Sequence, residues 1–154
     1  MKCSRCRLAC SALVLFLAGA GNASAQERDI SCQDVPAAVR AAFNRAYPKA
    51  AIKDCSQEIE DGKTAYEIAS KEDHTGRDVL FYADGTVIVV EETIALGDIP
   101  KAVKDALHKR YSDKQVKLAE KVMRQGTVLY EFQIHHQGGI VEVVLDGAGH
   151  ERKP

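Results

Sequence analysis

Residues 34–47 of this chain read DVPAAVRAAFNRAY, and residues 98–111 read DIPKAVKDALHKRY. The second stretch begins 64 positions after the first, and both stretches open with an acid, an apolar residue and a proline and close with a tyrosine. In each stretch apolar side chains recur three and four positions apart, a spacing that places them in one stripe along a helix. The two stretches therefore predict two amphipathic helices.

The ends of the two predicted helices carry residues with separate physical roles. Asp34 and Asp98 are expected to cap the free backbone N–H groups at the helix start, and the proline two residues later falls in the first turn, where a missing N–H costs nothing. Pro48 is expected to end the first helix, and Ser112-Asp113 the second.

The similarity between the two halves continues beyond the helices. The matching positions are Gly62 with Gly126, Tyr66-Glu67-Ile68 with Tyr130-Glu131-Phe132 and, after a two-residue deletion, Asp84-Gly85 with Asp146-Gly147. Self-similarity in one register predicts a tandem duplication, with a first repeat at 26–93 and a second at 94–154.

After each helix the period of the apolar residues changes from helical to two, which is typical of half-buried strands. The expected strands are 51–60, 63–72, 77–83 and 86–92 in the first repeat, and about 115–125, 127–136 and 139–146 in the second. Residues 149–152 are polar and predict a short edge strand. The expected fold class is α+β, a tandem repeat of one helix packed on a four-stranded antiparallel meander sheet.

Residues 1–25 have the pattern of a secretory signal peptide. Three basic residues precede the apolar run 8–20, and the small residues Ala23-Ser24-Ala25 fit a signal peptidase. The alternative is a retained membrane anchor, but a span needs roughly 20 apolar residues, and Gly21-Asn22 interrupts this run. Cleavage after Ala25 predicts a periplasmic or secreted protein with no membrane attachment.

The charge of the exported part argues against a nucleic-acid partner. Removal of Lys2, Arg5 and Arg7 reduces the 21 Lys and Arg residues to 18, against 22 Asp and Glu, so the net charge is −4. A chain that binds a phosphate backbone needs a basic patch, and none is evident.

Two cysteines, Cys32 and Cys55, remain after the signal peptide is removed. In an oxidising compartment two cysteines indicate one disulfide. A helix from 34 to 47 advances roughly 20 Å, and a strand from 50 to 55 returns roughly 17 Å, which brings Cys55 back beside Cys32. The alternative is a pair of free thiols held for chemistry, although the spacing is not C-x-x-C.

No catalytic motif was found in the exported part, so the sequence predicts no enzyme and no cofactor. Its four serines lie in neither a G-x-S-x-G nor an S-x-x-K arrangement. His135 and His136 are neighbours on a predicted strand and point to opposite faces, which disfavours a shared metal ion. The alternative is a small-ligand or metal site that uses His135, Glu142 and His150, or His135 with Glu131.

The open face of the predicted sheets is the candidate binding surface. Tyr66 and Tyr130 are expected to pack under the helices, while Glu67 and Glu131 face water on the opposite side. The candidate binding residues on that face are Glu67, Tyr82, Glu131, Gln133, His135 and Glu142, and Leu80 and Val144 share it. Such an acidic face would suit a basic or mixed partner.

The D-[VI]-P-x-A-V…Y opening, the Y-E-[IF] strand and the closing D-G hairpin resemble the PepSY-like family, also described as beta-lactamase-inhibitor-like. The resemblance covers about 33–93 and 97–152. It implies one helix on a four-stranded antiparallel sheet, used twice, in small exported bacterial proteins. In the inhibitor that gives the family its description, paired sheets form a concave surface that grips an enzyme, and related PepSY domains are associated with restraint of secreted peptidases.

This chain departs from an inhibitor in two respects. It has no tryptophan and few aromatic residues to serve as binding anchors, and its second sheet is expected to be truncated. The sequence therefore predicts an exported non-enzymatic binding module that holds or inhibits an unidentified protein or peptide of the cell envelope, and the alternative is a periplasmic small-ligand or metal-binding protein.

Overall fold

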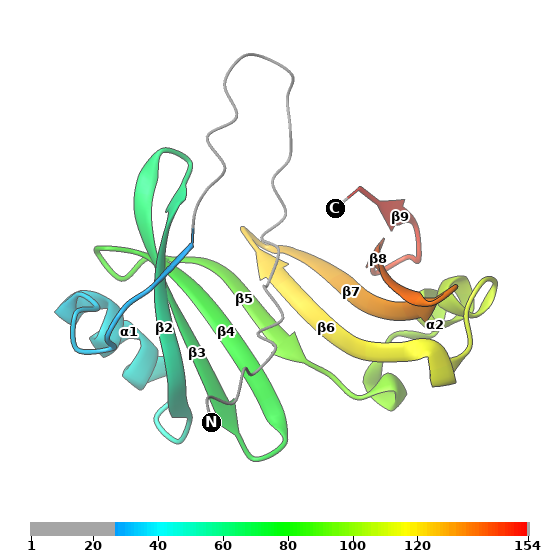
Figure 1. Ribbon diagram of the computed structural model, residues 1–154, viewed down its shortest axis with the longest axis horizontal. Helices are drawn as coiled ribbons and strands as arrows, with labels where there is room; N and C mark the ends of the chain where they lie inside the picture. The colour runs from blue at the N-terminus through cyan, green and yellow to red at the C-terminus, as the bar shows by residue number, and fades with distance from the viewer. Residues whose placement is uncertain (1–26, 154) are drawn as a thin grey trace.

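The computed structural model of the chain describes residues 27–153, and the predicted signal peptide lies outside the described residues. Nine antiparallel strands form one continuous sheet in the order of the chain (Figure 1). The strands are β1 (Arg28–Asp29), β2 (Ala51–Glu60), β3 (Lys63–Glu72), β4 (Thr75–Tyr82), β5 (Val87–Thr93), β6 (Val116–Arg124), β7 (Thr127–His136), β8 (Gly139–Asp146) and β9 (Glu151–Arg152). The α-helices are α1 (Ala37–Ala46) and α2 (Lys101–His108), and short 3-10 helices η1 (Leu96–Asp98) and η2 (Asp113–Gln115) flank α2.

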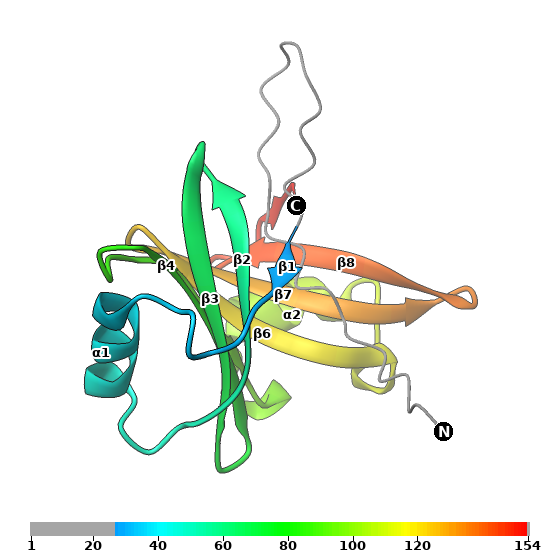
Figure 2. The same ribbon diagram turned by 60° about the vertical axis from the view of Figure 1, so that its left-hand side comes forward.

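The two helices lie at opposite ends of the sheet (Figure 1), and the turned view of Figure 2 shows α2 behind strands β6 and β7. Both cover the same sheet face, because Met123 of β6 packs against the core under α1 and Ala119, an even number of positions earlier on that strand, belongs to the core under α2. Within residues 27–153, no helix has both the length and the apolar content needed to cross a membrane.

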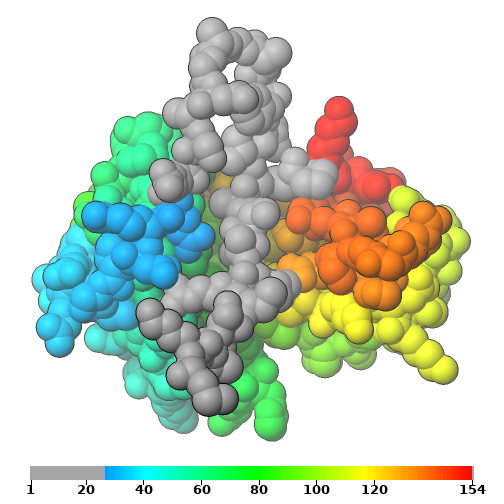
Figure 3. Space-filling model, in the orientation of Figure 1, coloured from blue at the N-terminus to red at the C-terminus, as the bar shows by residue number. Residues whose placement is uncertain are grey.

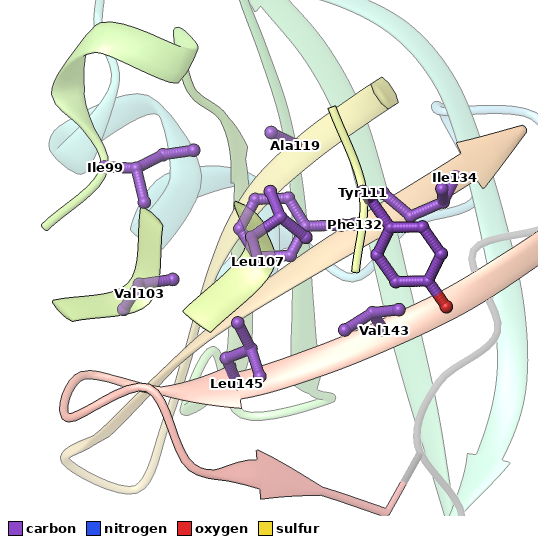
Figure 4. Packing of buried hydrophobic residues seen from close by; sticks show 9 residues of the cluster. All are labelled: Ile99, Val103, Leu107, Tyr111, Ala119, Phe132, Ile134, Val143 and Leu145. Atoms are coloured by element: carbon purple, nitrogen blue, oxygen red, sulfur yellow. The ribbon is translucent and has the colours of Figure 1, made fainter. Parts of the chain in front are cut away.

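Each helix is held by the apolar stripe that the sequence predicts. Val35, Val39 and Phe43 are at most 1% exposed and pack on Ile68, Val79 and Phe81 of the sheet. Under α2 the side chains of the core converge in the same way (Figure 4). This second core consists of Ile99, Val103, Leu107, Tyr111, Ala119, Phe132, Ile134, Val143 and Leu145.

The predicted helix caps were wrong. The N-cap residues are Pro36 and Pro100, with ψ values of 142° and 141°, and neither helix start has a side-chain cap. Asp34 therefore lies outside the helix, and Asp98 ends η1 instead of capping α2. Because the proline ring restricts φ and leaves no N–H, proline fits the extended residue immediately before the helix as well as the first turn.

The two sheets expected from the sequence are joined into one. β5 pairs with β6 in five register pairs, from Val89 opposite Arg124 to Thr93 opposite Glu120. β5 thus has a neighbour on each side, and Val89 and Val90 are buried. Alternation within a strand indicates which face each residue occupies, but it does not indicate which strand lies alongside.

The last hairpin corrects the alignment of the two halves. In the first half Gly85 N–H donates to Tyr82 O, and in the second half Gly149 N–H donates to Asp146 O, each at 2.9 Å. Gly85 therefore corresponds to Gly149 in the same register that matches the two helices, and the predicted two-residue deletion that matched Asp84-Gly85 with Asp146-Gly147 was wrong. The turn requires a glycine with positive φ, which is Gly149 at 83° and not Gly147.

The outer edge of the second half ends as a short strand, as expected. β9 pairs only with Val144 and Leu145 of β8. Asp146 fixes the connecting turn, because its carboxylate accepts hydrogen bonds from the backbone N–H groups of Ala148 and His150 and from the Arg152 guanidinium. The hydrogen bond from the backbone N–H of His150 is the largest of the causes that lower the pKa of Asp146.

The predicted disulfide is present between Cys32 and Cys55, with Cα atoms 5.2 Å apart. It ties the segment before α1 to β2, beside the hydrogen bond from Ile30 N–H to Cys55 O at 3.0 Å. In the second half Ala119 takes the place of Cys55. Ala119 is opposite Phe132 of β7, just as Cys55 is opposite Ile68 of β3.

We expect replacement of Cys32 and Cys55 by alanine to lower the free energy of unfolding by roughly 3 kcal/mol, because the disulfide closes a loop of about 24 residues in the unfolded chain. Urea unfolding with and without reductant checks this. Reductant should destabilise the wild type and leave the Cys32→Ala/Cys55→Ala variant unchanged. A wild type that is indifferent to complete reduction would contradict the prediction.

Gly149 offers a second test of the fold. A Cβ at this position would lie 2.5 Å from the carbonyl oxygen of Ala102 in α2, whereas a Cβ on Gly126, whose φ of 79° is similar, meets nothing within 4 Å. We expect Gly149→Ala to cost about 3 kcal/mol and Gly126→Ala about 1 kcal/mol, because only the first adds overlap to the backbone penalty. Equal losses in thermal unfolding would show that the hairpin does not press on α2.

Candidate functional site

The sheet face that α1 and α2 leave uncovered, here called the open face, carries at least one carboxylate on each of seven consecutive strands, and one from each strand forms a row. Alternation and register place all seven on this face, where neighbouring members are either directly opposite or one diagonal step apart. This carboxylate row consists of Glu58, Glu67, Asp78, Glu91, Glu120, Glu131 and Glu142.

An apolar row runs beside the carboxylate row. From β4 to β8, the residue two positions from each carboxylate on the same strand is a leucine or valine. The members of the apolar row are Leu80, Val89, Val122, Leu129 and Val144. Leu80, Val89 and Val144 are at most 6% exposed, so the middle of the open face has a packed apolar floor.

The two rows border a groove with a volume of about 460 Å³. Its described lining contains the whole apolar row and five members of the carboxylate row, together with Arg124, Gln125 and Thr127. The groove extends over strands β2 to β8 and therefore over both halves of the chain, which Figure 3 shows on opposite sides of the molecule in blue to green and yellow to red.

Positive charge is scarce in this groove. Arg124 is the only basic residue of the described lining, and its guanidinium forms an ion pair with Glu60 at the end of β2. Within residues 27–153, no ion pair involves Glu67, Glu120 or Glu131.

Burial and mutual repulsion shift the protonation of the carboxylate row. Burial is the largest cause that raises the pKa of Glu67 to about 8, and Asp78 is its strongest charged neighbour. Burial likewise raises the pKa of Glu131 to about 8, helped by Glu142, and the pKa of Glu120 to about 7, helped by Glu91. The row is therefore partly protonated at neutral pH.

Two buried polar atoms at the ends of the carboxylate row make no hydrogen bond with the described residues. They are Oγ of Ser56, a residue that is 5% exposed and lies directly opposite Glu67, and Oε1 of Glu142 on β8. Buried polar groups nearly always have a hydrogen-bond partner. Each of these two oxygen atoms is therefore able to accept a hydrogen bond from a bound molecule.

The structure brings the six candidate residues from the sequence to one face but not to one place. Glu67 and Glu131 line the groove, and Glu142 extends the carboxylate row. The other three, Tyr82, Gln133 and His135, share the open face outside the groove lining, and Tyr82 donates a hydrogen bond to Asp61 at 3.3 Å. Glu67 and Glu131 lie on the side of the sheet opposite Tyr66 and Tyr130, as expected, but they are half-buried and not fully in water.

The candidate surface from the sequence lacked four carboxylates of the carboxylate row and three residues of the apolar row, namely Glu58, Asp78, Glu91, Glu120, Val89, Val122 and Leu129. Asp78 could have been found from its position two residues before Leu80. Placing Glu120 and Val122 required the pairing of β6 with β5, for which the sequence gives no signal.

The residues of the alternative small-ligand or metal site do not gather. His135 and Glu142 lie one diagonal step apart on the open face, but His150 is in the turn before β9, with Nδ1 3.3 Å from Oδ2 of Asp146. Within residues 27–153, no three His, Cys, Asp or Glu side chains are grouped so as to hold a metal ion.

The raised pKa values predict that replacing a buried glutamate with glutamine changes the free energy of unfolding by an amount that depends on pH. Since the folded chain holds protons on Glu67 and Glu131 more tightly than the unfolded chain, their contribution to stability is complete below about pH 4.5 and is lost as the pH rises through about 8. We expect Glu67→Gln to be neutral near pH 4.5 and to add about 2 kcal/mol near pH 8.5, a figure reduced for solvent screening.

Urea unfolding of Glu67→Gln and of wild type at both pH values measures this difference. Glu151→Gln is the matched control for the loss of one carboxylate, because Glu151 is an exposed residue of β9 outside the carboxylate row, where it pairs with Arg110. The prediction fails if the advantage of Glu67→Gln over wild type is the same at both pH values.

Comparison with solved structures identifies the same fold in several bacterial proteins. A protein from Bacteroides eggerthii described as "putative periplasmic" has 20% sequence identity and a TM-score of 0.64, over 76% of this chain and 85% of that chain. A DUF2874 family protein from Bacteroides ovatus has 17% identity and a TM-score of 0.62, over 78% and 86%. A BLIP-like protein from Bacteroides fragilis has 21% identity and a TM-score of 0.57, over 76% and 85%.

Comparison with curated protein sequences gave no significant match. The profile of one family, described as "Putative beta-lactamase-inhibitor-like, PepSY-like", matches residues 21–89 and again residues 72–150. These two segments span most of the chain, including both helices and strands β1 to β8. The chain therefore belongs to the PepSY-like family.

Proposed function

We propose that this chain is an exported, non-enzymatic binding protein of the periplasm that holds a protein or peptide partner in the groove of its open face. The observation that carries the proposal is the groove itself, whose apolar floor lies beside Glu67 and Glu131, two carboxylates without ion-pair partners among residues 27–153. Apolar surface surrounded by polar groups is typical of an interaction site.

Three further observations support this function. Residues 1–25 have the pattern of an export signal. The protein from Bacteroides eggerthii that shares the fold carries a periplasmic description, and the family is described by its likeness to a beta-lactamase inhibitor. An inhibitor acts by binding a protein, which agrees with a role based on a surface.

The electrostatics of the groove favour binding over catalysis. Acid and base catalysis by two carboxylates needs groups whose pKa values are pushed apart. In the carboxylate row the pKa values of Glu67, Glu120 and Glu131 are all raised. The described lining also contains no serine, cysteine or histidine.

We also infer that the open face arose by tandem duplication of one unit of a helix and four strands. In the register that matches Asp34 with Asp98, Glu67 corresponds to Glu131, Asp78 to Glu142 and Leu80 to Val144. The duplication would therefore have repeated part of each row and so contributed to a surface long enough for a polypeptide.

Affinity capture tests the proposal, with residues 26–154 as the bait, periplasmic extract of the source organism as the source of partners and mass spectrometry as the readout. We expect Leu129→Lys to abolish retention of the partner because it places a charge on the groove floor. Ile59→Lys is the matched control, since Ile59 is 49% exposed and lies on the opposite face of β2.

Retention of one protein by wild type and Ile59→Lys, with loss in Leu129→Lys, is the expected result. Retention of the same protein by all three baits would place its binding site outside the groove. Recovery of nothing above background by wild type would contradict the function.

A further inference from the structure

The carboxylate row and the apolar row run side by side over a considerable length of the open face. On each strand from β4 to β8, the two side chains are separated by two positions, or roughly 6.6 Å. Seven strands at a spacing of about 4.8 Å carry the carboxylate row roughly 29 Å across the sheet, and its four diagonal steps also shift it along the strands in one direction. A partner that uses both rows must present two adjacent rows of its own.

When the carboxylate row is ionised, part of its charge has no counter-charge in the fold. Glu120 and Glu131 are directly opposite each other on β6 and β7, an arrangement of like charges that destabilises a sheet. Neither forms an ion pair within residues 27–153, and Arg124 is already paired with Glu60. Basic side chains of a partner would relieve this repulsion.

The unpartnered polar atoms are an independent sign that something binds along the row. Ser56 is buried on the open face at the β2 end, directly opposite Glu67, and its hydroxyl has no hydrogen-bond partner among the described residues. At the β8 end, Oε1 of Glu142 is likewise buried and has no hydrogen-bond partner among the described residues. Both residues lie outside the groove lining, so a partner that reached either end of the row would extend beyond the groove.

The requirement for two adjacent rows distinguishes a helix from a strand. A strand presents a single row of side chains on each face, so it could offer basic or apolar side chains to the groove but not both rows. A helix presents neighbouring rows through its i, i+3 and i+4 positions. At about 1.5 Å per residue, a helix of about 19 residues spans roughly 29 Å.

We propose, resting on the binding function above, that the groove receives a basic amphipathic helix of the partner, with lysine or arginine side chains along the carboxylate row and apolar side chains along the apolar row. The positive row of the helix supplies the charge that the open face lacks, and the apolar rows exclude water between them.

The shifted pKa values support a further property of this complex. Acids face Glu67 from β2, β4, β5 and the residue before β1, and acids face Glu131 from β5, β6 and β8. These neighbours are Glu27, Glu58, Asp78 and Glu91 for Glu67, and Glu91, Glu120 and Glu142 for Glu131. A basic helix favours the ionised carboxylates, so binding should release protons and weaken as the pH falls from about 8 to about 5.

Synthetic peptides and residues 26–154 of the protein test the proposal by isothermal titration calorimetry. The first peptide has about 19 residues, with lysine and leucine in adjacent helical rows. The second has the same composition in strict alternation, which favours a strand. The third replaces each lysine of the first with glutamate.

We expect the helical lysine peptide to bind, the alternating peptide to bind at least 10-fold more weakly, and the glutamate peptide not to bind. A Glu120→Gln/Glu131→Gln variant should bind the helical peptide at least 10-fold more weakly. Removing like charges does not endanger the fold, and Glu151→Gln is the control that should bind as wild type does.

Equal binding of the helical and alternating peptides would contradict the proposal that the groove receives a helix. Equal binding by wild type and the Glu120→Gln/Glu131→Gln variant would overturn the role of the carboxylate row. Failure of all three peptides, while Leu129→Lys still loses the captured partner and Ile59→Lys keeps it, would overturn this inference and leave the binding function intact.

Discussion

The pairing of β5 with β6 is the interaction on which the rest of the structure depends. It joins the strands after α1 and the strands after α2 into one sheet through the five register pairs between Val89–Thr93 and Glu120–Arg124. Without it the first half would end in an open edge at the apolar strand β5, and a strand of that kind pairs readily with other chains. The groove also depends on this pairing, because its lining comes from strands on both sides of the junction.

The open face trades stability for a surface that is ready to bind. The fold places carboxylates next to one another, partly buries them and provides little positive charge in return, which is the reverse of what a stability optimum would require. The helix-covered face compensates through two apolar cores and, in the first half, a disulfide. The two faces of one sheet thus have separate tasks, and each face constrains alternate residues of the same strands.

The elements of this fold could be predicted from the sequence because each has a local cause. The helical stripe of Val39 and Phe43 and the alternation along 127–136 depend only on nearby residues, and the predicted bounds of β2, β3, β7 and β8 agree with the structure. The disulfide followed from the lengths of α1 and β2. The helix caps were missed because Pro36 takes the position that the aspartate was expected to fill.

The site was predictable only in part, since a surface row depends on register between strands. Alternation placed Glu67, Glu131 and Glu142 on the correct face, but the order in which strands lie side by side arranges them in a line. Register also adds to the raised pKa values, whose main cause is burial, because acids such as Asp78 and Glu91 belong to different strands of the chain and are directly opposite in the sheet.

The junction at β5 and β6 also makes the two halves interchangeable between molecules. The five register pairs of β5 with β6 are the same whether β6 belongs to the same chain or to a second copy, provided that residues 94–95, which connect β5 to η1, extend away from the first half. Two chains that exchange their second halves would form a dimer by domain swapping. Such a dimer would contain two complete grooves, each lined by both polypeptides, so self-association by this route would preserve the open face.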